Sequence, residues 1–229
     1  EQVLVRVTGQ RNAAGLPGAQ ALLKQPGRYV QQFRYRMIPA EERVTSDTPL
    51  RLWVRFDAAS LERGLRDTGL PFWGRERPET LVWLALERDG KRELVSELSA
   101  ADIKAPLQAA ARRRGLPLVF PLMDLEDRDQ VSFTDVWGGF MDSLLEASVR
   151  YRPQALLVAR LYQERSGNWS ARWTLRVQGA DRSWSDGQPN LDSLLSEGMD
   201  LAADELATRF AIQDTGGVTS LYLAVDGVE

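Results

Sequence analysis

The segment GLPFWGRERP, residues 69–78, gathers side chains that could bind a ligand. Its candidate binding residues are Phe72, Trp73, Arg75, Glu76 and Arg77. An aromatic platform beside arginine and glutamate suits a sugar or an anionic ligand, since rings offer apolar contact and charged groups fix orientation. The segment also fits a packing role, in which the two rings fill a seam between two lobes and Arg75 or Arg77 pairs with a nearby acid. The sequence leaves both interpretations open.

The acidic run DLEDRD, residues 124–129, could offer carboxylate ligands to a hard cation such as calcium. The candidate ligands are Asp124, Glu126, Asp127 and Asp129. The run lacks the glycine and the distal glutamate of an EF-hand loop, and its spacing does not match one. Acidic side chains also favour a helix N-terminus. We therefore expect a solvated loop that leads into a helix, and neither a metal nor another cofactor.

Histidine and cysteine are both absent from the sequence. Ser-His-Asp triads, thiolate nucleophiles, haem ligation by histidine and Cys-His zinc sites are therefore excluded for this chain alone. The 32 acidic residues allow many carboxylate pairs, but none lies in a recognisable catalytic setting. The glycines of VWGGF, residues 136–140, fall inside a predicted helix, so they do not form a phosphate-binding loop. We expect a protein without enzymatic activity.

Charge and composition set limits on the partners of the chain. A net charge of −3 and a pI near 5.3 argue against sequence-independent binding to nucleic acid, which needs a positive surface. The basic run at residues 112–114 fits the last turn of a helix, with Gly115 as its stop. No stretch approaches the ~18 consecutive apolar residues of a membrane span. We expect no nucleic-acid partner and no membrane span.

Alternating and helical hydrophobic patterns predict the elements that would position these residues. Strands are predicted at residues 29–38, 50–56, 80–87, 154–162, 169–177, 183–185 and 218–225. Helices are predicted at residues 17–24, 57–67, 100–114, 134–151 and 190–210, whereas residues 1–8 fit a strand or the end of a helix. Asp57 is a good N-cap for the second of these helices, and Val136, Phe140, Leu144 and Ala147 share one stripe of the fourth. The alternation at residues 50–56 is that of a half-buried strand. Trp169 and Trp173 lie on the apolar side of theirs, whereas Trp53 and Trp184 fall on faces that could be exposed.

The order of these elements predicts a mixed α/β sheet with helices packed on it. A seam bounded by prolines, residues 71–78, divides the chain into a small α+β lobe over residues 1–74 and an α/β domain over residues 79–229. The tripeptide Gly-Leu-Pro follows a predicted helix at residues 69–71 and again at residues 115–117. Glycine there takes the left-handed conformation and proline prevents continuation, so the tripeptide marks helix ends.

Several separate blocks of the sequence resemble one protein family. They are VLVRVTG at residues 3–9, LWVRFD at 52–57, GLPFWGRERPETLVWLA at 69–85, PLMDLEDRDQVSFTDVWGGF at 121–140 and ASVRYRPQALLVARL at 147–161. Over essentially the whole chain they are similar to the proteobacterial domain of unknown function 2066 (DUF2066). The resemblance implies an exported envelope protein, located in the periplasm after removal of a signal peptide. It implies no activity and no catalytic residue.

A second resemblance concerns the order of elements from residue 81 onward. This order is similar to the N-terminal domain of TolB, an anticodon-binding-domain-like fold, and to the middle domain of the flagellar ring protein FlgT. The run ALLVARLYQERSGNWSARWTLRV, residues 155–177, and the helix after it carry the likeness. In those proteins such domains mediate contacts between envelope proteins and are not catalytic, which is an analogy at the level of the fold.

These observations predict a non-enzymatic periplasmic protein that acts through contacts with another envelope protein. The alternative is a small-molecule or glycan-binding protein, or a carboxylate-based hydrolase, that uses a cleft between the two lobes beside Trp73. A third possibility is a structural part of a longer protein. The sequence opens on Glu1 without an initiator methionine, and its last predicted strand could lead into a further domain.

Overall fold

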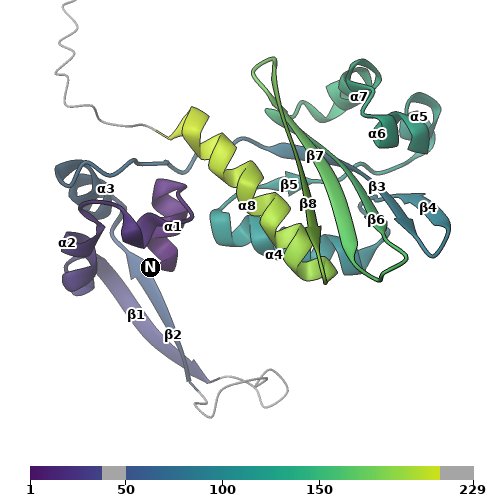
Figure 1. The fold of residues 1–229 in the computed structure, drawn as a ribbon. Helices are drawn as coiled ribbons and strands as arrows, with labels where there is room; N and C mark the ends of the chain where they lie inside the picture. Colours follow the sequence, from purple (N-terminus) through teal and green to yellow (C-terminus); the bar gives the residue numbers. More distant parts are fainter. Residues whose placement is uncertain (38–49, 212–229) are drawn as a thin grey trace, which may run out of the picture. The chain divides into compact units, whose positions relative to one another are not determined.

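The computed structural model describes residues 1–37 and 50–211 (Figure 1). The predicted strand at residues 218–225 lies outside them. The described chain divides into two compact units, a larger one of residues 1–13 and 73–211 and a smaller one within residues 14–72. The division into lobes 1–74 and 79–229 stays a prediction. The structure groups residues 1–13 with the larger unit.

The larger unit is built on a mixed sheet with the strand order β4-β3-β6-β7-β8, in which the short β5 also pairs with β3. Its strands are β3 (Thr80–Arg88), β4 (Lys91–Leu94), β5 (Leu118–Val119), β6 (Ala155–Gln163), β7 (Trp169–Val177) and β8 (Ala180–Gln188). β3 runs parallel to β5 and β6, and the other pairs are antiparallel. The apolar runs of β3 and β6 are buried, as expected for central strands. The predicted mixed α/β sheet with packed helices is confirmed.

Helices cover the two faces of this sheet unequally (Figure 1). On one face, α8 (Leu191–Phe210) lies on β7 and β8 and packs against α4 (Ala101–Arg114), which contacts α1 (Gln2–Thr8). On the other face, α5 (Leu125–Gln130), α6 (Phe133–Gly138) and α7 (Met141–Ser148) enclose a smaller core with β3 and β6. On that second face, β7 and β8 carry half-buried or exposed polar side chains. One half of the second face is therefore open.

Two helices, α3 (Ala58–Asp67) and α4, end in the same hydrogen-bonded turn. The glycines that follow them, Gly69 and Gly115, have φ angles of 69° and 75°. The amides of the next residues, Leu70 and Leu116, each donate to a carbonyl five residues back at 2.9 Å. Both leucines are buried, as this type of helix end favours. The helix-ending role predicted for Gly-Leu-Pro is confirmed at both places.

The single helix predicted over residues 134–151 is wrong, because the structure contains two helices there followed by the 3-10 turn η4 (Val149–Tyr151). A capping box of Ser132 and Asp135 begins α6. Gly139 ends it with a φ of 71°, and this left-handed residue resets the helical register before α7. Phe140, expected on the inward stripe, is consequently 54% exposed.

The smaller unit consists of α2 (Ala19–Lys24), α3 and a two-stranded antiparallel ribbon. The ribbon strands are β1 (Val30–Met37) and β2 (Leu50–Phe56), and the 3-10 turns η1 (Ala13–Gly15) and η2 (Pro26–Tyr29) precede α2 and β1. The Asp57 side chain caps α3 by accepting from the Ser60 amide at 2.8 Å, which confirms the predicted N-cap. Figure 1 shows the ribbon extending away from α2 and α3.

The half-burial expected for β2 is confirmed at Val54 and Phe56 and is wrong for the first part of the strand. Leu50 and Leu52 are 45% and 52% exposed. Within the part of the chain that the structure describes, β1 and β2 pair only with each other. The alternating pattern identified an apolar face correctly, but a pattern within one strand does not tell what covers that face.

Arg114 joins three helices of the larger unit. Its side chain is 2% exposed and donates to the carboxylates of Asp200 at 2.8 Å and Asp204 at 2.5 Å. A further hydrogen bond of 2.8 Å reaches the carbonyl of Gly9, just after α1. Arg114, which lies in the last turn of α4, therefore also connects α1, α4 and α8 through buried hydrogen bonds.

Candidate binding surfaces

The predicted binding segment at residues 72–77 surrounds a buried tryptophan. The Trp73 side chain is 2% exposed, and its amide donates to the carbonyl of Val7 at 2.7 Å. The ring lies against Gly9 so closely that a Cβ atom at that glycine would be 2.5 Å from it. Trp73 is thus packed inside the larger unit. Phe72, which is half-buried, belongs to the smaller unit.

Arg77 covers the buried ring. Its guanidinium lies 3.9 Å from the centroid of the Trp73 ring and donates to the carbonyls of Arg6 at 2.6 Å and Trp73 at 2.8 Å. Burial, together with the charges of Arg6 and Arg114, lowers the pKa of Arg77 to about 10. Among the described residues, no acid pairs with Arg77 or with the exposed Arg75. Glu76 is exposed as well.

The acidic run at residues 124–129 is not the expected solvated loop, because Asp124 caps the helix α5 and the rest of the run lies within it. Its carboxylates surround an arginine. Asp124 caps α5 and accepts two hydrogen bonds of 2.8 and 2.9 Å from Arg150, which also lies 3.1 Å from Asp127 and 3.4 Å from Glu126. Tyr151 donates to the buried Asp127 at 2.7 Å. Asp129 is exposed. Three of the four candidate metal ligands therefore face a cation that the chain itself supplies.

This network shifts two pKa values. The hydrogen bonds from Arg150 and from the α5 backbone lower the pKa of Asp124 to about 2. Burial and the hydrogen bond to Asp127 raise the pKa of Tyr151 to about 12. Near neutral pH, the lowered pKa keeps Asp124 ionised and the raised pKa keeps Tyr151 protonated, as their hydrogen bonds require. The network connects α5 with η4, and this geometry indicates a structural role.

The ribbon presents an apolar face. In the register of the two strands, Phe33 pairs with Val54, Tyr35 with Leu52 and Met37 with Leu50, so that these six side chains share one side. Phe33 and Tyr35 are each 62% exposed and Met37 is 68% exposed. Contiguous exposed apolar side chains of this kind mark interaction sites on proteins.

The opposite face of the ribbon is cationic. It carries four arginines and one tryptophan, namely Arg34, Arg36, Arg51, Arg55 and Trp53. The guanidinium of Arg34 lies 4.3 Å from the centroid of the Trp53 ring, and Arg36 lies opposite Arg51. Residues 30–37 and 50–56 contain no acidic side chain. The ribbon is thus apolar on one side and positively charged on the other.

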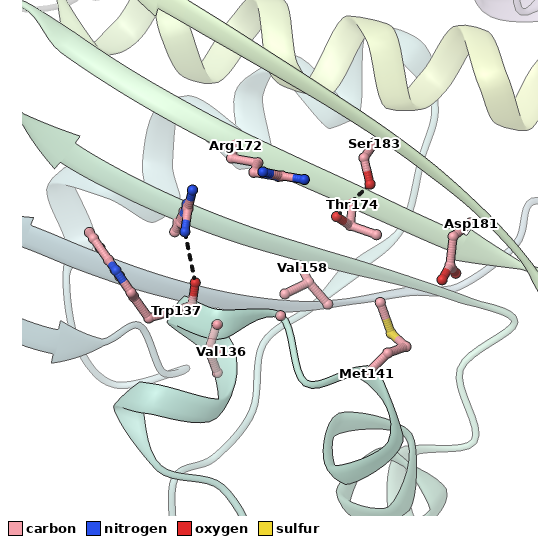
Figure 2. Close-up of a pocket in the computed structure, with 11 residues that line it drawn as sticks. Val136, Trp137, Met141, Val158, Arg172, Thr174, Asp181 and Ser183 are labelled. Carbon is pink, nitrogen blue, oxygen red and sulfur yellow. Dashed lines mark hydrogen bonds between the residues drawn. The ribbon is translucent and has the colours of Figure 1, made fainter.

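A second surface lies on the open half of the sheet in the larger unit (Figure 2). A cavity of about 300 Å³ is bounded by β6, β7 and β8 and by the corner between α6 and α7. Its polar side includes Arg160, Arg172 and the hydroxyls of Thr174 and Ser183, which are 2.9 Å apart. Its apolar side is formed by Val136, Trp137, Met141 and Val158. In Figure 2 the guanidinium of Arg172 points toward the two hydroxyls.

A neighbouring hollow of about 350 Å³ shares the two arginines. Arg160 and Arg172 line both hollows, and Tyr162, Ser170 and Ser185 line the second. The arginine pair therefore stands between two depressions of the same sheet face. Neither depression contains a residue of the predicted binding segment.

Sequence reasoning missed both surfaces for the same reason. The alternation at residues 169–177 places Arg172 on a polar face, whereas Arg160 lies in the mostly apolar run of β6. A hairpin turn sets the register of the two strands that it connects. Pairing residues outward from the turn at Ser166, Gly167 and Asn168 places Arg160 opposite Arg172, as in the structure. In the ribbon, the alternation within each strand places three apolar side chains on one side, and only the register of the two strands brings all six together.

Comparisons with known proteins bring no activity to this chain. Residues 1–74 match a family described as a domain of unknown function (DUF8605). No curated protein matches. One similar solved structure, titled "Crystal structure of uncharacterized protein", is 12% identical and covers 58% of this chain and 99% of its own, with a TM-score of 0.22. A score that low carries no argument about the fold.

The structure adds one finding on membranes. Within residues 1–37 and 50–211, no helix combines the length and the apolar character needed to cross a bilayer. The resemblance to DUF2066, the likeness to TolB and FlgT and the periplasmic location stay predictions. The part of the chain that the family match covers includes the ribbon, and its description assigns no role to that part.

Proposed function

We propose that this chain is a non-enzymatic protein of the cell envelope that acts through contacts with another protein, and that the ribbon of β1 and β2 is its docking surface. The observation that carries the proposal is the exposed apolar face, whose side chains reach 68% exposure at Met37. The periplasmic location rests on the resemblance to DUF2066.

An isolated two-stranded ribbon is marginally stable in water, because it has one hydrogen-bonded interface and no covered face. Phe33, Tyr35 and Leu52 lie together on the exposed side. Burial of such side chains contributes roughly 25 cal/mol per Å² of apolar area. A partner that covers them would therefore stabilise both the ribbon and the complex. This supports a contact surface in preference to a solvated arm.

The chemistry of the ribbon indicates the kind of partner. Each strand has an outer edge that pairs with no other described strand, and extended peptides bind such edges through main-chain hydrogen bonds. The four arginines of the cationic face favour acidic side chains in the partner. We infer a partner segment in extended conformation, with apolar side chains toward Tyr35 and Leu52 and acidic ones toward Arg34 and Arg36.

A photo-crosslinking amino acid at Tyr35 tests this proposal in cells that export the full chain. We expect a discrete adduct with another protein, and we expect its yield to fall at least about tenfold when Arg34 and Arg36 are both changed to glutamate, because the partner is acidic. The matched control is the same probe at Leu98, which is 92% exposed in the larger unit and should give no such adduct. An adduct with a second copy of this chain or with lipid would overturn the proposal, as would a yield unchanged by charge reversal.

The alternative of a glycan or small-molecule site at Trp73 needs an accessible ring. The Trp73 side chain is packed against Gly9 and covered by Arg77. No observation in the described structure favours that alternative over the ribbon.

A further inference from the structure

We infer that Arg160 and Arg172 form a binding site for a small phosphate monoester on the open half of the sheet. This site lies in the larger unit and does not depend on the function proposed for the ribbon. Nothing in the matched family or in the similar structure assigns it.

The first observation is the direct opposition of two like charges. Arg160 of β6 and Arg172 of β7 are partners in the antiparallel register and lie on the same face of the sheet. Like charges directly opposite each other on neighbouring strands are destabilising. A bound anion would turn this repulsion into two attractive contacts.

The second observation is that neither arginine forms an ion pair with a residue that the structure describes. Arg160 donates to the carbonyl of Trp137 at 3.3 Å, a bond drawn dashed in Figure 2. Arg172 is exposed and makes no hydrogen bond or ion pair with any residue that the structure describes. Asp181 also lines the cavity, but its carboxylate accepts two hydrogen bonds of 2.5 and 2.7 Å from Arg176. Asp186 lines the second hollow, where it accepts from the Gly187 amide at 2.8 Å and from the Gln188 side chain, and it makes no ion pair with either arginine.

The third observation is the arrangement of hydrogen-bond donors. The hydroxyls of Thr174 and Ser183 lie beside the arginines, and Figure 2 shows Arg172 directed at them. Two guanidinium groups with nearby hydroxyls suit an oxyanion, because each planar guanidinium can offer two parallel donors. A phosphate monoester carries about −1.5 to −2 charges near pH 7, which matches two arginines better than the single charge of a carboxylate.

The shape of the cavity limits the rest of the ligand. Trp137, Met141 and Val158 also line the cavity, and they offer a small apolar contact for an organic group attached to the phosphate (Figure 2). A volume of about 300 Å³ is at the lower end of small-molecule sites and accommodates a small monoester. Phenyl phosphate fits this description and serves as the probe.

Calorimetric titration of the whole chain with phenyl phosphate tests the site. We expect one bound molecule per chain, weaker binding of inorganic phosphate, and a loss of at least about tenfold in affinity for Arg172→Gln and for Arg160→Gln. The matched control Arg165→Gln removes the same charge from the nearby turn and should change affinity less than about twofold. No heat with phenyl phosphate up to about 10 mM, or equal losses in Arg172→Gln and Arg165→Gln, would overturn the inference.

Two further arms test the chemical class and separate it from folding. Benzoate should bind at least about tenfold more weakly than phenyl phosphate, and equal affinities would contradict the assignment of a dianion. Without ligand, Arg172→Gln should melt at the same temperature as the wild-type chain or higher, because it removes a like-charge contact. A lower melting temperature would show that Arg172 has a structural role and would count against the site.

Discussion

β7 in the larger unit and β2 in the smaller unit have similar sequences and opposite surroundings. Both strands, WSARWTLRV and LRLWVRF, have an apolar residue at every second position, and the other positions hold arginine, serine or threonine, except for Trp53 in β2. The apolar side of β7 is buried under α8, and Trp173 is 0% exposed. The apolar side of β2 has no covering helix at its beginning, and Leu52 is 52% exposed. The comparison shows that alternation predicts a strand with one apolar side. Whether that side becomes part of a core or an interface depends on whether a helix packs on it.

The largest loss of stability is expected from removing the Trp173 ring of β7, and the matching change on β2 is Trp53→Ala. Trp173→Ala should lower the free energy of unfolding by ~3–5 kcal/mol, because it leaves a cavity in the closed core. Trp53→Ala should cost less than about 1 kcal/mol, because that ring is partly exposed and contacts Arg34 across open surface. Urea unfolding followed by circular dichroism measures both. Equal losses would remove the distinction between the two strands.

The next effect concerns what holds the covering helices of the larger unit. Arg114→Met should cost about 2–4 kcal/mol, because it leaves Asp200 and Asp204 without the cation buried between α4 and α8. Arg113→Met is the control, since Arg113 is exposed and bonds only Ser196 among the described residues. Chemical denaturation of the two variants should separate them clearly. If both were neutral, Arg114 would not join the helices as described.

A smaller effect is expected at the beginning of α8, the helix that covers β7. The Asn190 side chain accepts from the Ser193 amide at 2.8 Å and caps the helix. Asn190→Ala should lower stability by ~1 kcal/mol, and Asn190→Asp should restore most of it because aspartate is an equally good N-cap. Thermal unfolding of both variants provides the test. An aspartate variant as weak as the alanine variant would argue against a capping role.

The smallest effect at neutral pH concerns the tie between α5 and η4 on the second sheet face. The pKa of Asp124 is held at about 2, below its ordinary 3.8, chiefly by Arg150. A lowered carboxyl pKa stabilises the fold above the unfolded pKa, and this contribution disappears as pH falls through the folded pKa. Melting temperature should therefore fall between about pH 4 and pH 2 more steeply in the wild type than in Asp124→Asn. Parallel profiles of melting temperature against pH would contradict this.

The sequence predicted the elements whose signals are local. The cap at Asp57 and the helix ends at Gly69 and Gly115 depend on a few neighbouring residues, and the structure confirms them. The burial of Trp173 followed from strand alternation together with a helix available to cover it. These features follow from short-range rules of propensity and capping.

What the sequence did not predict depends on contacts between distant segments. The break at Gly139 required knowing that this glycine adopts a left-handed conformation inside an apparently helical pattern. The exposure of Leu52 and the pairing of Arg160 with Arg172 depend on which segments lie beside each strand. The proposed binding residues at 72–77 were chosen for their chemistry, and that chemistry also builds a core, as Trp73 does here.

The most direct test of the central claim is the oxidation of methionine by hydrogen peroxide, followed residue by residue with mass spectrometry. Met37, on the apolar face of the ribbon, is 68% exposed, and Met199, inside α8, is 0% exposed. Because oxidation follows exposure, Met37 should convert to the sulfoxide at least about ten times faster than Met199 in the isolated chain. Protection of Met37 equal to that of Met199 would show that the face is covered within the chain and would contradict its role as a docking surface.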